Sequence, residues 1–550
     1  MRPRARLATP LTTTSEPVLD DPDRWRARST EGMAVAYWAA VAPHRPALVP
    51  TVAAHAGDAR TYAELNGRVN QLVRALRARG LQRGDGVAAL IPNRTAFVEV
   101  YWACLRAGWR FTPINWHLAA DEVAYIVDDC GARAFVVDGS LAAIAERAAA
   151  GAAALTVRYR TADDSAGVGA GSGVFDDYDA DLAPHSSADI DDPHAGVTML
   201  YTSGTTGRPK GVFKERHSTL VVDRAVYLPG VVHLLTGPLY HAAPLGITMH
   251  AALSSGSTLV LMEHWDAEHT LQLIDEHKVN YTHVVPTMFH RLLALPEDTK
   301  ARYDLSSLFV AVHGAAPCPV HVKQAMIEWW GPVIWEYYAA TEGAGTLVDS
   351  MTWLAHPGTV GRPNPEGQVY VGDADGNPIP PDHVGTVWLR AVDTERFHYL
   401  GDDQKTVASF RGDYFTLGDL GSIDADGFLY LSDRSAHLII SGGVNIYPAE
   451  VDAVLLEHPD VADAATIGIP NDDWGEEVKS VVELQAAIDA FDHEEKQREL
   501  IAFCRDRLAH FKCPRSIDFV AHLPRQDNGK IAKVRLRDQY RERASTASAD

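Results

Sequence analysis

Short continuous runs of apolar residues alternate with a stretch of helical periodicity in the first half of the chain. Residues 87–91, 134–137 and 257–261 are such runs, and they lack the polar alternation of a half-exposed strand. They are typical of parallel strands covered on both faces. Residues 61–76 instead carry apolar side chains at helical spacing, and Gly80 follows as a residue suited to ending a helix. The alternation predicts a layered α/β fold.

Two stretches depart from this pattern. Residues 1–30 are polar and contain Pro and Arg, which predicts a loosely held arm, and we expect order to begin near Met33. Between residues 160 and 192 the composition shifts to Asp, Gly, Ser and Ala with little periodicity. This segment is predicted to be an exposed acidic connection.

A domain boundary is predicted near residue 433. Residues 424–427, Asp-Ala-Asp-Gly, have the composition of a hairpin turn, and residues 450–456 have the pattern of an amphipathic helix. We therefore expect a large N-terminal domain of layered α/β sheets, residues 31–433, and a small mobile α+β domain, residues 434–550. A chain of 550 residues exceeds the size of a single core, which agrees with this division.

Composition describes a globular protein and argues against several classes. Hydrophobic residues make up 46% of the chain and charged residues 22%. With 50 Lys and Arg against 72 Asp and Glu, the net charge of −22 argues against a nucleic-acid-binding surface. No secretion signal or run of about eighteen apolar residues is visible, so no membrane span is expected. The oligomeric state is open at this level, and a homodimer is only the general prior for a globular chain.

The cysteines indicate a reducing compartment. They are odd in number and widely spaced, without a C-x-x-C pair, which is typical of reduced thiols rather than of a zinc or redox site. We therefore expect a cytoplasmic protein. The five residues are Cys104, Cys130, Cys318, Cys504 and Cys513.

Residues 201–212, Tyr-Thr-Ser-Gly-Thr-Thr-Gly-Arg-Pro-Lys-Gly-Val, combine glycines, hydroxyls and a lysine in one loop. The glycines allow tight turns that bring backbone N–H groups close to an anion, and the side chains add further donors. A kinase-type loop needs glycine before the lysine and a hydroxyl after it, but Pro209 and Gly211 stand there, which argues against a Walker A loop. The predicted phosphate-binding residues are Thr202, Ser203, Gly204, Thr205, Thr206 and Lys210.

This loop and four later segments, in the same order, resemble the signature of the adenylate-forming superfamily. That superfamily contains acyl-CoA synthetases, luciferases and the adenylation domains of peptide synthetases. Ala339 and Leu417 replace a usual glycine and threonine. The four later segments are residues 338–342 (Tyr-Ala-Ala-Thr-Glu), 415–419 (Phe-Thr-Leu-Gly-Asp), 433–450 (Asp-Arg, then Ile-Ile-Ser-Gly-Gly-Val-Asn-Ile-Tyr-Pro-Ala-Glu) and 523–531 (Leu-Pro-Arg, then Gly-Lys-Ile).

The resemblance implies a site for ATP. It implies that Tyr338 stacks on adenine, and that Asp419 and Arg434 bind the ribose. Thr341 and Glu342 would serve the phosphates and magnesium, since a hard cation takes oxygen ligands such as Glu342 and Thr202. The small residues that leave room for the adenine are Gly314, Ala315 and Ala316.

The resemblance also implies which residues act on the acid. Lys530 would bridge the acid and the α-phosphate, because this step is catalysed mainly by positioning and charge neutralisation. Lys533 is its local competitor. His241 would position the acid or gate its pocket, with a buried structural histidine as the alternative. The remaining candidates for the substrate pocket are His313, Gly314 and Ala340.

The expected activity is that of an acid–CoA ligase. An apolar carboxylic acid and ATP would give acyl-AMP and pyrophosphate, and coenzyme A would then attack while AMP leaves. Gly442 and Gly443 would let the pantetheine arm pass close to the backbone. Ala436 and His437 differ from the residues that the family more often has after the hinge. They keep open an amide ligase that passes the acyl group to an amine such as an amino acid.

Other functions are less well supported. No Gly-Gly-x-Ser carrier segment follows Lys530, which argues against a peptide-synthetase module. The motifs alone do not separate a ligase from a luciferase. A non-catalytic protein that binds nucleotide or acyl-AMP is the alternative from another class, and the presence of Lys210, Glu342 and Lys530 argues against it.

Overall fold

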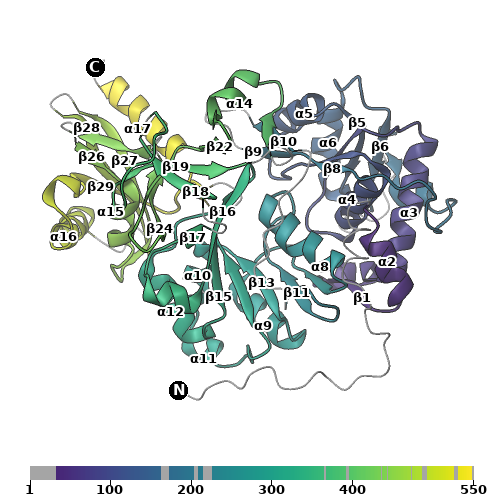
Figure 1. The fold of residues 1–550 in the computed structure, drawn as a ribbon, viewed down its shortest axis with the longest axis horizontal. Helices are drawn as coiled ribbons and strands as arrows, with labels where there is room; N and C mark the ends of the chain where they lie inside the picture. Colours follow the sequence, from purple (N-terminus) through teal and green to yellow (C-terminus); the bar gives the residue numbers. More distant parts are fainter. Residues whose placement is uncertain are drawn as a thin grey trace.

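Figure 1 shows two large α/β units and a smaller unit near the C-terminus, drawn in yellow and light green. The predicted arm, residues 1–30, lies outside the described residues. The predicted α/β class is confirmed. The computed structural model describes residues 32–162, 173–202, 209–214, 226–363, 367–373, 375–391, 396–434, 437–441, 444–471, 474–485, 492–525 and 530–547.

The first sheet is entirely parallel and has the order β7-β6-β5-β3-β4-β8. The predicted runs at 87–91 and 134–137 fall in β3 and β5, and every residue of β3 is buried. Burial on both faces explains why these strands show no polar alternation. The strands are β3 (Gly86–Leu90), β4 (Arg110–Pro113), β5 (Ala132–Val137), β6 (Val157–Arg160), β7 (Asp176–Asp177) and β8 (Val197–Thr198).

The predicted helix after residue 61 is α3 (Tyr62–Ala78). The Thr61 side chain accepts from the Glu64 amide while the Glu64 carboxylate accepts from the Thr61 amide, a capping box that starts the helix. Gly80 has a φ of +94° just beyond the helix end. The other helices of this unit are α2 (Ala34–Val41), α4 (Thr95–Ala107), α5 (Ala120–Asp129), α6 (Ala142–Ala149) and α7 (Tyr178–Leu182), with short 3₁₀ turns η1 (Ala53–Asp58) and η2 (Gly139–Leu141).

The second sheet has nine strands in the order β17-β16-β15-β14-β13-β11-β12-β1-β2. Its strands from β15 to β1 are parallel, and the outer pairs are antiparallel. The predicted run at 257–261 is β12. The strands are β1 (Pro46–Pro50), β2 (Arg60–Thr61), β11 (Val232–Leu235), β12 (Thr258–Leu261), β13 (Tyr281–Val284), β14 (Val310–His313), β15 (Ile334–Ala340), β16 (Gly343–Asp349) and β17 (Arg362–Pro363).

Helices accompany this sheet between its strands. Pro244–His250, which precedes α8, is a π-helix, η4, a form that is rare and often found at functional sites. The α-helices are α8 (Ala251–Ser254), α9 (Ala267–Glu276), α10 (Pro286–Leu293), α11 (Glu297–Lys300), α12 (Val320–Trp330) and α13 (Ser350–Ala355).

Two antiparallel sheets follow. A three-stranded sheet has the order β20-β10-β9, and another joins β18, β19 and β21 to β24. The predicted turn at residues 424–427 connects β23 to β24, with Gly427 at a φ of +84°. The elements are β9 (Leu200–Thr202), β10 (Lys210–Lys214), β18 (Val369–Gly372), β19 (Gly385–Arg390), β20 (Phe397–Tyr399), α14 (Asp403–Ser409), β21 (Phe410–Arg411), β22 (Tyr414–Phe415), β23 (Asp419–Ile423) and β24 (Leu429–Arg434).

The C-terminal elements form a five-stranded sheet with three helices. The predicted helix at residues 450–456 is α15. Val451 and Leu455 of this helix are fully buried in a core of their own, apart from the cores of the large sheets. The elements are β25 (Ile439–Ser441), β26 (Val444–Ile446), α15 (Pro448–Leu455), β27 (Val461–Asn471), β28 (Gly475–Leu484), α16 (His493–Arg505), η8 (His510–Lys512), β29 (Ser516–Val520) and α17 (Lys533–Ala547).

The acidic stretch after residue 160 corrects one expectation. It is not only an exposed connection, because it contains α7, whose Tyr178 is 1% exposed. Its aspartates pair with arginines at the end of α3 and just beyond it: Arg77 Nη1 lies 2.8 Å from Asp192 Oδ1, and the guanidinium of Arg79, the residue after the helix, contacts Asp176 and Asp181. The acidic composition therefore serves a packed surface whose partner lies about a hundred residues earlier in the chain.

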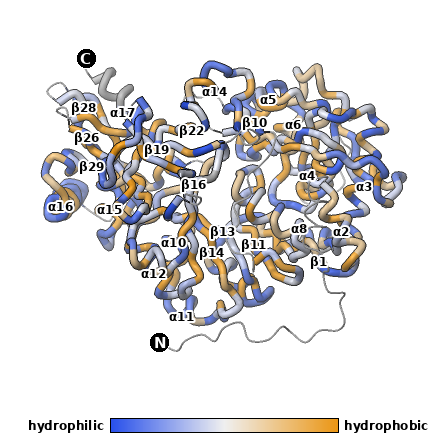
Figure 2. The backbone as a smooth tube through the Cα atoms, viewed as in Figure 1, coloured by the Kyte–Doolittle hydropathy of each residue, from blue (hydrophilic) through white to orange (hydrophobic). Residues whose placement is uncertain are grey.

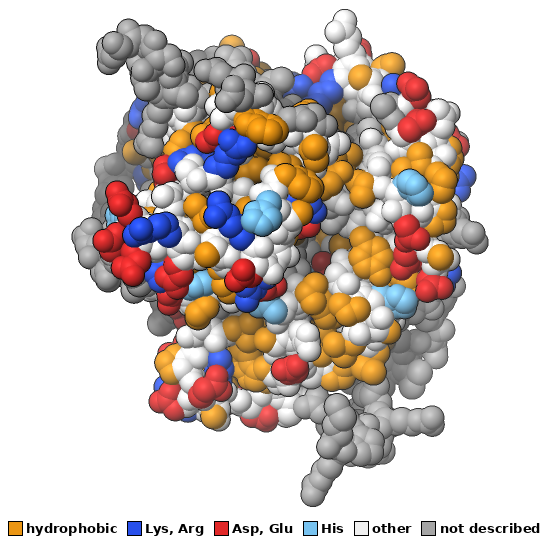
Figure 3. All heavy atoms as spheres, turned by 90° about the vertical axis from the view of Figure 1, so that its left-hand side faces the viewer, with side chains coloured by type: hydrophobic (Ala, Val, Ile, Leu, Met, Phe, Trp, Pro, Cys, Tyr) orange, Lys and Arg blue, Asp and Glu red, His pale blue; other side chains and the backbone are white. Residues whose placement is uncertain are grey.

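Surface and core separate as the composition suggests. In Figure 2 orange, hydrophobic stretches follow the inner elements, and an outer helix such as α16 is mostly blue. On the side that Figure 3 shows, acidic and basic side chains are interspersed. All five cysteines are free thiols, as predicted. Within the described residues, no helix is long and apolar enough to cross a membrane.

Candidate active site

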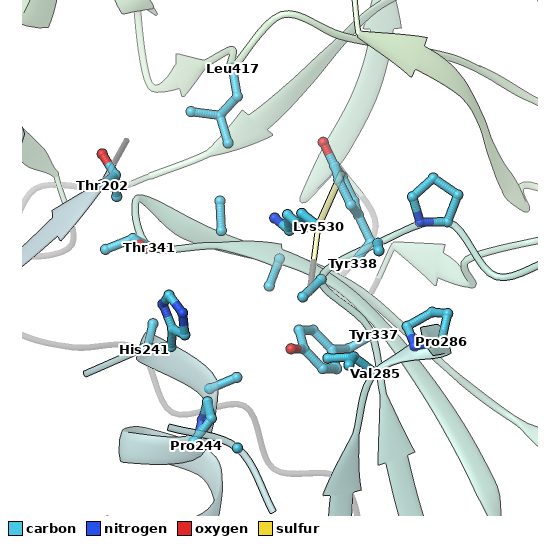
Figure 4. A pocket seen from close by; sticks show the side chains of 18 of the residues that line it. Thr202, His241, Pro244, Val285, Pro286, Tyr337, Tyr338, Thr341, Leu417 and Lys530 are labelled. Atoms are coloured by element: carbon cyan, nitrogen blue, oxygen red, sulfur yellow. The ribbon is translucent and has the colours of Figure 1, made fainter. Parts of the chain in front are cut away.

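A cleft of about 2840 Å³ gathers most of the predicted site residues that the structure describes. It is lined by β9, the segment before η4, the end of β13, β15 with the turn that follows it, β23 and the segment before α17. Figure 4 shows Thr202, His241, Tyr338, Thr341 and Lys530 around one common space. The predicted residues that line the cleft are Thr202, His241, Ala315, Ala316, Tyr338, Ala340, Thr341, Glu342, Asp419 and Lys530.

The two ends of the predicted phosphate loop lie on paired strands. Thr202 at the end of β9 is the register partner of Lys210 at the start of β10. The Lys210 ammonium donates to Asp402 Oδ2 at 2.6 Å, a pairing that the sequence did not reveal. The predicted donors between these strands, Ser203, Gly204, Thr205 and Thr206, lie outside the described residues.

Glu342 is fixed by a tyrosine of the small sheet. It is 6% exposed, and its Oε1 accepts a hydrogen bond from the Tyr399 hydroxyl at 2.9 Å. Burial and the neighbouring Glu342 charge raise the pKa of Tyr399, so the hydroxyl remains a donor. Within the described part of the chain no donor reaches the other oxygen, Oε2. The Thr202 hydroxyl lines the same cleft as this carboxylate. Both groups offer oxygen ligands of the kind that Mg²⁺ prefers.

The nucleoside side of the cleft joins three strands. Tyr338 of β15 donates a hydrogen bond to Asp419 Oδ2 at 2.7 Å, and Asp419 is 8% exposed. Asp419 in β23 is the register partner of Arg434 in β24. The backbone thus brings the three predicted nucleoside residues to one place.

The segment of small residues after β14, residues 314–316, has an unusual backbone conformation. Ala315 has a φ of +68°, a left-handed conformation that is uncommon for a residue with a side chain and that clusters at functional sites. Ala315 and Ala316 line the cleft. Gly314 lies behind them, where an added Cβ would come within 2.6 Å of the Tyr337 ring. Gly314 is therefore required by packing rather than by room for a ligand.

The two candidate lysines near the C-terminus are now distinguished. Arg525 and Ile531 form an antiparallel bridge, and Lys530 directly precedes Ile531 of this bridge. In Figure 4 the nitrogen of the Lys530 side chain points into the space that Thr202, Thr341 and His241 surround. The Lys533 ammonium instead donates to Asp452 Oδ2 at 2.5 Å, at the start of α17. Both lysines line the cleft, and the ion pair that holds Lys533 to Asp452 favours Lys530 as the one that acts on a ligand. Gly442 and Gly443 lie outside the described residues.

The acid side of the cleft is mostly apolar. His241 stands just before η4, and Figure 4 shows its ring facing the same space as Pro244, Val285 and Pro286. Tyr337 closes this side, with 6% of its surface exposed. Such a lining suits an apolar acid with few polar groups.

One polar pair interrupts this apolar lining. The Tyr337 hydroxyl lies 3.1 Å from Nε2 of His283, which is itself 3% exposed. Burial lowers the pKa of His283 to about 4, and the nearby His241 adds to this effect. The imidazole is therefore neutral near pH 7. Neither residue was predicted, because the contact joins β13 to β15 and no local motif marks it.

His313 was expected in the substrate pocket, and the structure places it elsewhere. It ends β14, is fully buried, and has its Nε2 3.6 Å from Glu336 Oε2 and its ring 5.1 Å from that of Phe289. Burial and the nearby Lys323 charge lower its pKa well below the usual value. His313 is a neutral core residue behind the cleft. Its position next to Gly314 in the sequence suggested exposure that the strand does not provide.

Comparison with known proteins identifies the family. Residues 35–394 match the family model "AMP-binding enzyme", and residues 450–530 match "AMP-binding enzyme C-terminal domain". The chain therefore belongs to the AMP-binding enzyme family, which is the adenylate-forming superfamily that the motifs indicated.

Relatives with curated names resemble almost the whole chain. A feruloyl-CoA synthase of Amycolatopsis sp is 34% identical over 498 residues, which cover 89% of this chain and 96% of the relative. Long-chain-fatty-acid–CoA ligase FadD13 of Mycobacterium tuberculosis is 32% identical over 502 residues, covering 87% and 93%. A solved structure of the anthranilate CoA ligase AuaEII with anthranoyl-AMP has a TM-score of 0.80 at 23% identity, covering 94% and 98%, and shows the shared fold.

Proposed function

We propose that the protein is an ATP-dependent acid–CoA ligase that forms an acyl-AMP intermediate. The observation that carries this proposal is that Lys530, from the C-terminal elements, enters a cleft already lined by Thr202, Tyr338 and Glu342. The Lys530 cation, the candidate nucleoside site at Tyr338 and the side-chain oxygens of Thr202 and Glu342 thus lie together beside an apolar pocket. The named relatives, which are acid–CoA ligases, support the same activity.

The first half-reaction is assigned to these side chains. Tyr338 and Asp419 hold adenine and ribose, and Lys530 neutralises the charge shared by the carboxylate and the α-phosphate as they approach. Glu342 and Thr202 would hold Mg²⁺, which when bound screens the triphosphate charge. His241 faces the acid side and would orient the carboxylate.

The second half-reaction transfers the acyl group from AMP to the thiol of coenzyme A. We propose a boundary at the last residue of β24, between an N-terminal domain of residues 31–433 and a mobile domain of residues 434–550. Rotation of the small domain would withdraw Lys530 and admit the thiol. ATP and coenzyme A are cytoplasmic metabolites, so we place the enzyme in the cytoplasm. A homodimer is the assembly to test first.

We propose an apolar acid as substrate, because Pro244, Val285 and Pro286 form the acid side. The feruloyl and fatty-acyl substrates in the names of relatives have this apolar character. Tyr337 and His283 offer one polar contact in this pocket.

Product analysis tests the proposal. Purified protein is given ATP, Mg²⁺, a broad pool of carboxylic acids, coenzyme A and mixed amino acids, and products are identified by mass spectrometry. Acyl-CoA products that are absent with Lys530→Ala are expected. Acyl-amino-acid products without thioester would establish the amide ligase instead, and absence of any pyrophosphate release would indicate a binding protein.

A further inference from the structure

A second lysine lies beside the predicted phosphate loop. Lys405 belongs to α14 and lines the same cleft as Thr202 and Glu342. Its ammonium stands 4.5 Å from the centroid of the Tyr399 ring, and the hydroxyl of that ring donates to Glu342. Lys405 is therefore held one aromatic ring away from the candidate magnesium ligand.

The three-stranded sheet places this lysine near the loop. Val212 of β10, two residues after Lys210, is the register partner of Tyr399 in β20. Asp402 follows three residues later in the chain, accepts from the Lys210 ammonium, and caps α14 by accepting from the Lys405 amide at 3.0 Å. The sheet thus carries Lys210 at the start of β10, and α14, which follows β20, carries Lys405 on the same side of the sheet as the Lys210–Asp402 pair.

The two lysines differ in how their charges are balanced. Lys210 has Asp402 as a close partner, whereas Lys405 forms no salt bridge within the described ranges of the chain. Burial and the positive charge of Lys210 lower the pKa of Lys405, while Glu342 and Asp402 act in the opposite direction. Four charged groups are therefore within electrostatic reach of one another. Lys405 therefore presents a positive charge to the cleft without a close carboxylate partner among the described residues, which favours an anion beside it.

We propose that Lys405 is an ATP-binding residue that contacts the β- and γ-phosphates. In adenylate formation a carboxylate oxygen bonds to the α-phosphorus, the bond from that phosphorus to the α,β-bridging oxygen breaks, and pyrophosphate leaves with the bonding electrons. Lys405 neutralises the charge that collects on the pyrophosphate. AMP and acyl-AMP lack these phosphates, so the contact serves only the first half-reaction. The inference rests on the proposed function, because it requires the cleft to bind ATP.

Binding to the full-length protein tests this inference without an identified acid. Calorimetric titrations compare α,β-methylene-ATP and AMP, each with Mg²⁺, on wild type, Lys405→Met and Lys405→Arg. Methionine keeps the apolar stem against Tyr399 and removes the charge. We expect Lys405→Met to weaken binding of the ATP analogue about ten-fold, with AMP unchanged and Lys405→Arg close to wild type. Lys300→Met is the matched control, since Lys300 also lies over an aromatic ring, that of Trp329.

The outcomes separate this inference from the proposed function. Equal binding of the analogue by wild type and Lys405→Met, or equal weakening of AMP and analogue, would overturn the role of Lys405. Binding of the analogue by wild type with no acid activated would overturn the ligase proposal and leave the Lys405 comparison valid. With an activated acid in hand, Lys405→Met should slow acid-dependent pyrophosphate exchange and leave the conversion of supplied acyl-AMP to acyl-CoA unchanged.

Discussion

The Tyr338 hydroxyl donates a hydrogen bond of 2.7 Å to Asp419 Oδ2, and this contact links the large nine-stranded sheet to β23. Because the acceptor is a carboxylate, the bond is stronger than one between neutral groups. Asp419 is thereby oriented before any nucleotide arrives.

Tyr338→Phe should separate the contribution of the hydrogen bond to Asp419 from that of ring stacking in the binding of ATP. Phenylalanine keeps the aromatic face and removes the donor, so we expect the KM for ATP to rise about ten-fold with a smaller change in kcat. Steady-state kinetics at varied ATP measures this. Tyr303→Phe is the control, because Tyr303 donates to Glu268 at 2.9 Å away from the cleft. An unchanged KM in Tyr338→Phe would mean that the bond does not position the ribose site.

Lys530 and Lys533 should respond differently to alanine. Lys530→Ala removes the cation proposed to bridge the carboxylate and the α-phosphate and is expected to lower the rate of acyl-AMP formation about a hundred-fold or more. Lys533→Ala leaves Asp452, which is 13% exposed, without its cation, so Tm should fall while the rate changes by less than about three-fold. Pyrophosphate exchange measures the rate of acyl-AMP formation, and thermal unfolding measures Tm. A rate loss in Lys533→Ala as large as in Lys530→Ala would contradict the assignment.

Removing one partner of the buried Lys323–Glu336 ion pair should destabilise the protein strongly. The Lys323 ammonium donates to Glu336 Oε2 at 2.6 Å, with side chains 0% and 8% exposed. Lys323→Met leaves a buried carboxylate unpaired and should lower the unfolding free energy by about 3–5 kcal/mol. The double variant with Glu336→Gln should recover much of this loss. Urea denaturation measures both, and Lys278→Met, in an exposed pair with Asp275, should leave the curve unchanged.

Stability should fall as the pH drops from about 6.5 toward 4. Burial lowers the pKa of His283 from 6.5 to about 4, so in this window the unfolded chain binds a proton that the folded protein excludes. The stability that the neutral His283 imidazole contributes is fully present above pH 6.5 and is lost as the pH falls, and the loss reaches about 3 kcal/mol at pH 4 and below. His283→Gln should flatten the slope of unfolding free energy against pH. His522→Gln, at an 88% exposed site, is the control, and equal slopes in wild type and His283→Gln would refute the prediction.

Local patterns were sufficient for the fold class and for much of the site. The run at residues 87–91 predicted β3 because a strand buried on both faces needs only apolar residues. Thr202, Tyr338, Glu342, Asp419 and Lys530 were found because each lies in a contiguous motif whose order along the chain is informative. The structure then brought these motifs into one cleft.

Contacts between distant segments were not predictable in this way. Asp402 and Lys405 lie at the start of α14, where the sequence shows only the acidic and polar residues common at the beginning of a helix. It is the pairing of β10 with β20 that brings them close to Lys210. The Tyr337 and His283 contact needs the register of a sheet. His313 was misplaced for the same reason, because a residue's depth in a sheet is set by what packs on it and not by its neighbours in sequence.

The succession of Tyr337 and Tyr338 on β15 has an evolutionary consequence. Neighbouring side chains on a strand point to opposite faces, so in the proposed mechanism one strand would meet the acid with Tyr337 and the nucleotide with Tyr338. Drift at position 337 can therefore retune which acids are accepted while the energy-supplying half of the reaction keeps its geometry. New substrate preferences can arise in this scaffold one side chain at a time.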